Sequence, residues 1–176
     1  MPRIPVHTPE ESRAHVARPE RKTGRLLNIH AEVAHCPVVI AAYRGISQAI
    51  AEHGTFDART RKAIVPAVGN QNGRDYCRAA YTLSARKADL TNEQILTVCA
   101  GEVGFDDRLA AITEVARAAD TGNVPEVVWQ AALDAGWSDT ELAEAFAHLA
   151  DNLYTDYISH YAHTEPDLPA AEPLSA

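Results

Sequence analysis

Three residues near the middle of the chain have side chains that could do chemistry together. Arg74, Cys77 and Tyr81 are spaced i, i+3 and i+7, which places them on one face of a helix. Cys77 would lie in the first turn, where the helix dipole, unpaired backbone N–H groups and the charge of Arg74 favour a thiolate. Tyr81 could donate a hydrogen bond to a substrate oxygen or to the thiolate, and Lys62 could reach the same site from the preceding helix.

This cluster supports two opposite interpretations of Cys77. In the first, the thiolate attacks a peroxide and becomes a sulfenic acid, which a thiol from outside the chain must reduce. In the second, Cys77 is a buried packing residue in a site without activity, because cysteine often behaves as a small hydrophobic side chain. The residues alone leave both open.

The remaining histidines and cysteines have weaker claims to chemistry. His30 and His35 flank Glu32, but a spacing of five residues puts the two histidines on different helix faces, so no metal site is predicted. Cys36 and Cys99 are predicted to be packing residues, and His148 to face either the pocket or a neighbouring subunit. The sequence has no glycine-rich phosphate cradle and no zinc-finger spacing, so neither a nucleotide-type cofactor nor a metal is predicted.

Bulk composition narrows the class of protein. The chain has 176 residues, which suits one domain, and its 46% apolar and 23% charged residues are typical of globular proteins. A formal net charge of −8 argues against nucleic-acid binding, which needs cations to neutralise phosphates. No segment approaches the ~20 apolar residues that span a bilayer, and the N-terminus lacks the apolar stretch of a signal peptide. Three widely spaced cysteines do not form a disulfide framework, and we expect a cytoplasmic protein without membrane contact.

The elements that must position these residues are all predicted to be helices. Capping boxes begin at Thr91 and Ser138, Asp57 and Asp106 are candidate N-caps, and no stretch alternates like a strand. The fold class is therefore all-α, a bundle of about seven to eight helices. The segments expected to be helical are 37–53, 57–70 with a kink or an early end at Pro66, 75–87, 92–101, 106–122, 125–136 and a long last helix after residue 138. Residues 1–24 are predicted to be an N-terminal extension, 25–163 the helical domain, and 164–176 a loosely attached tail.

Two parts of the chain resemble the carboxymuconolactone decarboxylase and alkylhydroperoxidase D-like family. The first is the helix with Asp57–Lys62, followed by an asparagine-containing turn and the pair Tyr76-Cys77 in an alanine-rich helix. The second is Asn152–Tyr157 with the following Thr164-Glu165-Pro166-Asp167-Leu168-Pro169. The resemblance spans roughly residues 26–169. It implies a helical bundle that assembles as a homo-oligomer, often a trimer or a hexamer built from trimers.

The chain departs from the redox members of that family at three of four site positions. Those members carry Cys-x-x-Cys, a histidine four residues later, and a glutamate on the preceding helix. Here the four positions hold Arg74, Cys77, Tyr81 and Lys62. A disulfide within the motif is therefore impossible, and the family's glutamate–histidine proton relay is absent. If the site is a peroxidase, it is a one-cysteine antioxidant enzyme of the peroxiredoxin type that needs an external thiol reductant.

Two other functions remain open. The decarboxylase branch of the family acts on an anionic lactone without a redox cysteine pair. Lys62 and Arg74 would likewise favour a carboxylate-bearing substrate, as in a lyase, isomerase or hydrolase of organic acids. The third hypothesis is a non-catalytic helical oligomer that binds a small ligand or a partner protein.

Overall fold

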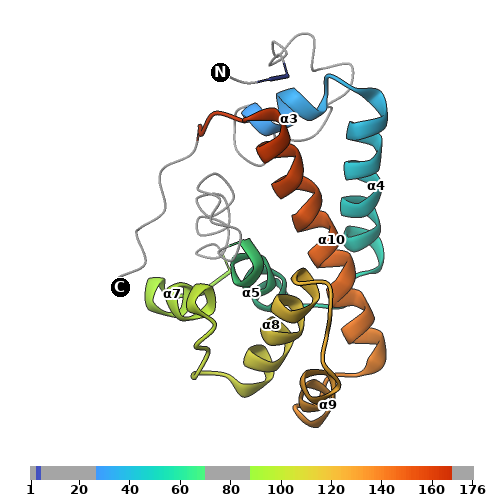
Figure 1. Cartoon of the computed structure of the whole chain (residues 1–176). Helices are drawn as coiled ribbons and strands as arrows, with labels where there is room; N and C mark the ends of the chain where they lie inside the picture. The colour runs from blue at the N-terminus through green and yellow to red at the C-terminus, as the bar shows by residue number, and fades with distance from the viewer. Residues whose placement is uncertain (1–2, 5–26, 70–87, 168–176) are drawn as a thin grey trace.

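The described part of the chain is entirely helical (Figure 1). The computed structural model describes residues 3–4, 27–69 and 88–167, and these contain seven α-helices and no strand. The bounds are α3 Asn28–Val33, α4 Pro37–His53, α5 Ala58–Gly69, α7 Asn92–Ala100, α8 Asp107–Asp120, α9 Glu126–Asp134 and α10 Asp139–Ala162. The all-α prediction is confirmed, and the predicted helix at 75–87 lies outside the described residues. None of the described helices is long and apolar enough to cross a membrane.

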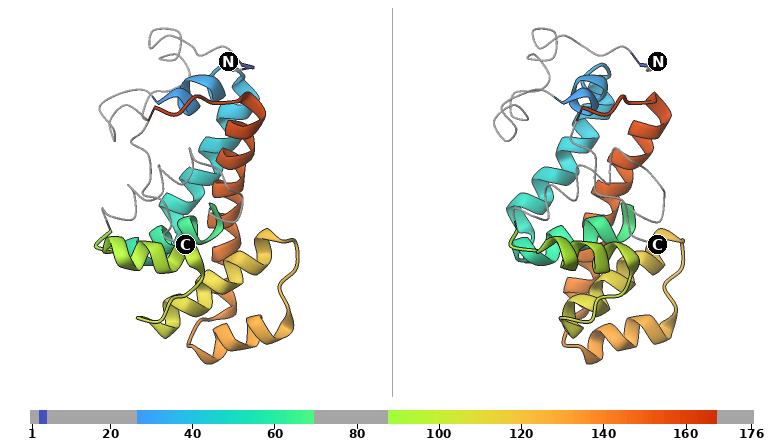
Figure 2. Two further views of the ribbon diagram at one scale, coloured as in Figure 1. Left: turned by 60° about the vertical axis from the view of Figure 1, so that its left-hand side comes forward. Right: turned by 90° about the vertical axis from the view of Figure 1, so that its left-hand side faces the viewer.

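The longest described helix, α10, is the axis around which the others pack (Figures 1 and 2). It contacts α3, α4, α5 and α8. Both figures show α4 running alongside α10, α3 lying across its C-terminal end, and α5 and α8 packed against its N-terminal half. Helix α9 packs on α8, and α7 packs on α5. Any site near α5 therefore lies close to α10.

Local capping signals begin and end these helices where the sequence predicts. The Thr91 hydroxyl accepts from Gln94 N at 3.2 Å while the Gln94 side chain accepts from Thr91 N at 3.0 Å, which completes the capping box of α7. Ser138 and Glu141 do the same for α10. Gly101 ends α7 with φ of 79°, a left-handed conformation in which glycine carries no Cβ penalty. The boundaries of α7 and the start of α10 hold because they depend on residues that are close in sequence.

Apolar side chains from five described helices, α5, α7, α8, α9 and α10, form the main core. Its fully buried members include Ile64 and Val68 from α5, Ile95 from α7, Ile112 from α8 and Leu149 from α10. Burying a side chain of this size contributes about 1.5–3 kcal/mol to folding. A second, smaller cluster joins α3 to α4 around Val33 and Ile40. The core thus holds α5 rigidly against α10.

The outward face of α10 carries three large aromatic side chains. Phe146, Tyr157 and Tyr161 have helical spacing with the core residues, yet they are 68%, 58% and 67% exposed in the single chain. The helical spacing of these residues therefore does not place them in the core of the single chain. Polar residues occupy part of the inward face of α10. The apolar side chains of this helix therefore extend beyond the surface that the other described helices cover.

The first residues of the predicted tail are firmly attached to α3, not loosely. The Asp167 carboxylate accepts from Asn28 N at 2.9 Å, and Asn28 Nδ2 donates to the Glu165 carbonyl at 3.0 Å. The Thr164 hydroxyl donates to Glu32, a buried carboxylate on α3. Leu27, the N-cap of α3, makes no side-chain cap hydrogen bond. Asp167 therefore caps a helix that lies about 140 residues away in sequence.

Candidate functional site

Of the four predicted site residues, the structure places Lys62. It lies on α5, half-buried, on the same helix as the core residues Ile64 and Val68. Arg74, Cys77 and Tyr81 lie outside the described residues, so their grouping with Lys62 stays a prediction. What the structure establishes is the scaffold that holds Lys62.

Two local features shape α5, an N-cap at its start and a proline in its interior. The Asp57 carboxylate accepts from Thr60 N at 2.7 Å, as an N-cap does, and this hydrogen bond holds the pKa of Asp57 below its usual value. Further along, Pro66 lies inside the helix. It has no N–H to donate to the Lys62 carbonyl, so this turn of α5 lacks one helical hydrogen bond. The helix continues because Ala63, Ile64, Ala67 and Val68 are all buried against neighbouring helices.

A row of polar side chains runs along the inward face of α10. Its members are four residues apart: Glu144, His148, Asn152 and Asp156. His148, Asn152 and Asp156 are only 6%, 3% and 0% exposed. Asn152 Nδ2 reaches the Val65 carbonyl on α5 at 3.5 Å, the outer limit of a hydrogen bond. Its Oδ1 is buried and makes no hydrogen bond with the residues that the structure describes.

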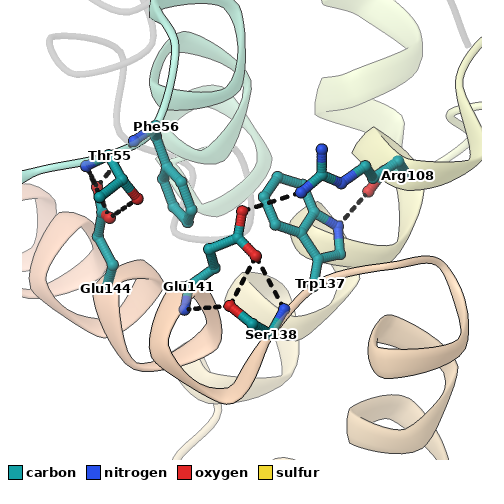
Figure 3. A network of polar contacts seen from close by, with 7 residues as sticks. All are labelled: Thr55, Phe56, Arg108, Trp137, Ser138, Glu141 and Glu144. Carbon is teal, nitrogen blue, oxygen red and sulfur yellow. Dashed lines mark hydrogen bonds and ion pairs between the residues drawn. The ribbon is translucent and has the colours of Figure 1, made fainter.

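The N-terminal end of this row anchors the loop between α4 and α5 (Figure 3). The Glu144 carboxylate accepts from Thr55 N and Phe56 N, at 2.9 and 3.1 Å, and from the Thr55 hydroxyl at 2.6 Å. Burial by itself would raise the pKa of Glu144, but these hydrogen bonds outweigh it and lower the pKa. With both oxygens occupied in this way, Glu144 acts as a structural anchor.

His148 completes this anchor. Its Nε2 lies 3.3 Å from Glu144 Oε1, and its ring stacks on Phe56 with centroids 5.3 Å apart. Burial lowers the pKa of His148, although Glu144 opposes this effect. The imidazole is thus neutral near pH 7. The sequence left open whether His148 faces a pocket or a neighbouring subunit; in this chain it packs under the α4–α5 loop.

A second network fixes the start of α10 on α8. Figure 3 shows the Trp137 indole donating to the Arg108 carbonyl, at 2.7 Å, while the Arg108 guanidinium lies over the Trp137 ring at 3.9 Å from its centroid. Arg108 Nη2 also donates to Glu141 at 2.9 Å, within the capping box that Ser138 begins. Trp137 is buried and therefore anchors the bundle.

The two described cysteines differ in their surroundings. Cys99 is 3% exposed within the main core, as predicted for a packing residue. Cys36 is half-buried and precedes Pro37, the first residue of α4. Among residues 3–4, 27–69 and 88–167, no group of three or more His, Cys, Asp or Glu side chains is arranged to hold a metal ion.

The buried polar row is what the sequence reasoning missed. Asn152 and Asp156 stand at the same four-residue spacing as His148 and Glu144. A polar residue at every fourth position of an apolar helix was the available signal, because residues i and i+4 share a face.

Comparison with known proteins supports the same fold. The family model described as "Carboxymuconolactone decarboxylase family" matches residues 37–121. No curated protein sequence matches the chain significantly. An uncharacterised peroxidase-related protein from Ralstonia eutropha JMP134, described as an alkylhydroperoxidase AhpD core, is 20% identical with a TM-score of 0.79. That match covers 94% of this chain and 92% of the other.

Two further structures share the arrangement at lower identity. A peroxidase-related protein from Silicibacter sp. TM1040 is 15% identical with a TM-score of 0.74, covering 93% of this chain and 90% of that one. The debrominase Bmp8 without ligand is 14% identical with a TM-score of 0.74, covering 90% and 85%. At these identities the likeness concerns the fold alone. Together these findings lead to one conclusion: the chain has the AhpD-like helical fold, and its residues 37–121 match the carboxymuconolactone decarboxylase family.

Proposed function

We propose that this chain is a thiol-dependent peroxidase that uses Cys77 as its single reactive cysteine. The observation that carries the proposal is the match of the family model to residues 37–121, a range that includes position 77. The burial of Cys99 in the apolar core supports the choice, because a thiol there meets neither solvent nor substrate. Two similar structures are described as peroxidase-related proteins. The debrominase was also studied as a cysteine-to-alanine variant with bound 2,3,4-tribromopyrrole, which further supports a cysteine as the reactive group.

The proposed cycle needs one cysteine and two equivalents of external thiol. The Cys77 thiolate attacks the terminal peroxide oxygen, the O–O bond breaks, and the alkoxide leaves as the alcohol after taking up a proton. Cysteine is thereby oxidised to sulfenic acid. One external thiol condenses with the sulfenic acid and releases water, and a second thiol reduces this mixed disulfide. Arg74 and Lys62 would favour the thiolate by their positive charge, and Tyr81 would donate a hydrogen bond to the peroxide.

The test is consumption of an alkyl hydroperoxide by the full chain with dithiothreitol as reductant. Cys77→Ser is expected to abolish turnover. Cys36→Ser and Cys99→Ser, the matched controls, are expected to keep most of it, with Cys99→Ser losing some stability. Turnover that survives in Cys77→Ser would refute the proposal.

A second candidate function is favoured by Lys62. A half-buried lysine stands on α5 where the redox relatives have an acid, which suits an anionic organic substrate better than a proton relay. A lyase, isomerase or hydrolase of this kind would keep its turnover in Cys77→Ser and lose it in Lys62→Ala and Arg74→Ala. The same three variants, assayed on both substrate classes, therefore separate the two functions.

We also propose that the chain forms a homo-oligomer, as its relatives often do as trimers or hexamers. The exposed aromatic face of α10 formed by Phe146, Tyr157 and Tyr161 supports this, because large apolar side chains are seldom left in water together. This proposal is independent of the reaction.

A further inference from the structure

A small pocket lies between α3, the start of α4, the C-terminal half of α10 and residues 3–4. Its volume is about 240 Å³, smaller than the pockets that bind drug-sized molecules, so it suits a ligand of only a few heavy atoms. Three branched aliphatic side chains form an apolar wall: Ile4, Val39 and Ile158. Glu32 and Arg3 bring one negative and one positive charge to the same pocket.

Glu32 is 2% exposed, so it lies at the floor of this pocket. Its Oε2 accepts from the Thr164 hydroxyl, whereas its Oε1 is buried and has no hydrogen-bond partner among the residues that the structure describes. Burial raises the pKa of Glu32; the Thr164 hydrogen bond opposes this effect, and the negative charges of Asp167 and Glu165 add to it. A buried carboxylate oxygen without a donor is costly. A ligand with N–H donors and a positive charge would supply what this oxygen lacks.

Arg3 lies at the rim of the pocket, because its side chain is exposed. Its backbone N–H donates to the Ala162 carbonyl at 2.6 Å, so the main chain at this point is held by the last residue of α10. Within the described ranges, the Arg3 guanidinium forms no ion pair with a carboxylate. The pocket therefore presents a buried acid at its floor, a cation at its rim and an apolar wall.

We propose that this pocket binds a small apolar α-amino acid. Its ammonium group would donate to Glu32 Oε1, and its carboxylate would pair with Arg3. Its side chain would lie against the wall formed by Ile4, Val39 and Ile158. An ammonium has three donors and no acceptor, and a guanidinium matches a carboxylate in geometry as well as charge. A ligand with only one of the two charges would leave either Glu32 or Arg3 without its partner.

The test is calorimetric titration of the full chain with L-valine and with two analogues that each lack one charged group. L-Valine is expected to bind saturably. 3-Methylbutanoate lacks the ammonium and is expected to bind at least tenfold more weakly. 2-Methylpropylamine lacks the carboxylate and is expected to bind roughly threefold more weakly, since an exposed ion pair contributes little. Absence of saturable L-valine binding, or equal binding of either analogue, would overturn the proposal.

Variants of the two charged residues connect the binding to the pocket. Glu32→Gln removes a buried charge at nearly constant size, so it is expected to fold and to weaken L-valine binding at least tenfold. Arg3→Gln is expected to weaken binding roughly threefold. Glu102→Gln, at an exposed position after α7, changes the net charge as Glu32→Gln does and should bind like the wild type. Unchanged affinity in Glu32→Gln or Arg3→Gln, or an equal loss in Glu102→Gln, contradicts the proposal.

Cys36 provides a second measurement of where the ligand lies. This half-buried cysteine also lines the pocket, so a bound amino acid should shield its thiol. Saturating L-valine is expected to slow the alkylation of Cys36 by iodoacetamide at least threefold, followed by peptide mapping. 3-Methylbutanoate at the same concentration should protect Cys36 little. L-Valine binding without protection of Cys36 would place the amino acid elsewhere on the chain and refute this site.

Discussion

At the scale of single residues, burial and hydrogen bonding decide what each charged group of the polar row can do. Glu144 is ionised because it receives hydrogen bonds from Thr55 and Phe56. His148 is neutral because its ring is packed under the same loop. The two groups lie one turn apart on α10 and contact each other, but hydrogen bonds from the loop dominate the pKa of Glu144 and burial dominates that of His148.

The lowered pKa of His148 predicts a pH dependence of stability. The unfolded chain takes up a proton on this ring near pH 6.5, whereas the folded chain takes it up only at lower pH. The free energy of unfolding should therefore decrease, and the protein become less stable, as pH falls below about 6.5. His148→Gln is expected to reduce this decrease, measured as the melting temperature between pH 7.5 and 5.

The control for this prediction is His160→Gln. His160 lies on the same helix but is exposed. The His160→Gln variant should keep the wild-type dependence of the melting temperature on pH. If His148→Gln leaves the slope between pH 7.5 and 5 unchanged, the burial of a neutral imidazole is not the cause.

At the scale of elements, the helix boundaries that depend on residues close in sequence were predicted correctly. The first residues of α4, α7 and α10 follow from Pro37, the Thr91 capping box and the Ser138 capping box. Each of these signals acts over a few residues. The cap of α3 by Asp167 could not be predicted in this way, because its partners are far apart in sequence. The same holds for the polar row, since burial of Asn152 depends on α5 and not on α10 itself.

Removal of the distant cap should loosen α3. Asp167→Ala is expected to lower the free energy of unfolding by about 1 kcal/mol, the usual contribution of a helix N-cap. Glu165→Ala is the matched control, because the described contact of Glu165 with Asn28 uses its backbone carbonyl. Urea unfolding of the two variants measures the difference. Equal losses would mean that the Asp167 carboxylate is not acting as a cap.

At the scale of the whole molecule, α10 presents two unlike faces. One face buries the polar row against the bundle, and the other exposes Phe146, Tyr157 and Tyr161. Family resemblance predicted the bundle and the oligomer, and the structure confirms the first. The cluster of Arg74, Cys77 and Tyr81 remains a prediction from the sequence, because those residues lie outside the described ranges.

The exposed face of α10 predicts the position of the subunit contact. Tyr161→Glu and Phe146→Glu would bury a charge without a partner in such a contact, so the oligomer should dissociate to smaller species in light scattering after gel filtration. Val127→Glu, an equally exposed site on α9, is the control and should keep the wild-type mass. A monomeric wild-type chain at micromolar concentration would contradict the proposal.

The central claim, that Cys77 is an activated thiol, is tested most directly by its rate of alkylation against pH in the Cys36→Ser, Cys99→Ser double variant. With Cys77 as the only cysteine left, iodoacetamide reports on this thiol alone. Activation by the Arg74 charge and a helix N-terminus predicts an apparent pKa clearly below the ~8.5 of a free thiol. An apparent pKa at or above that value would contradict the proposed peroxidase site.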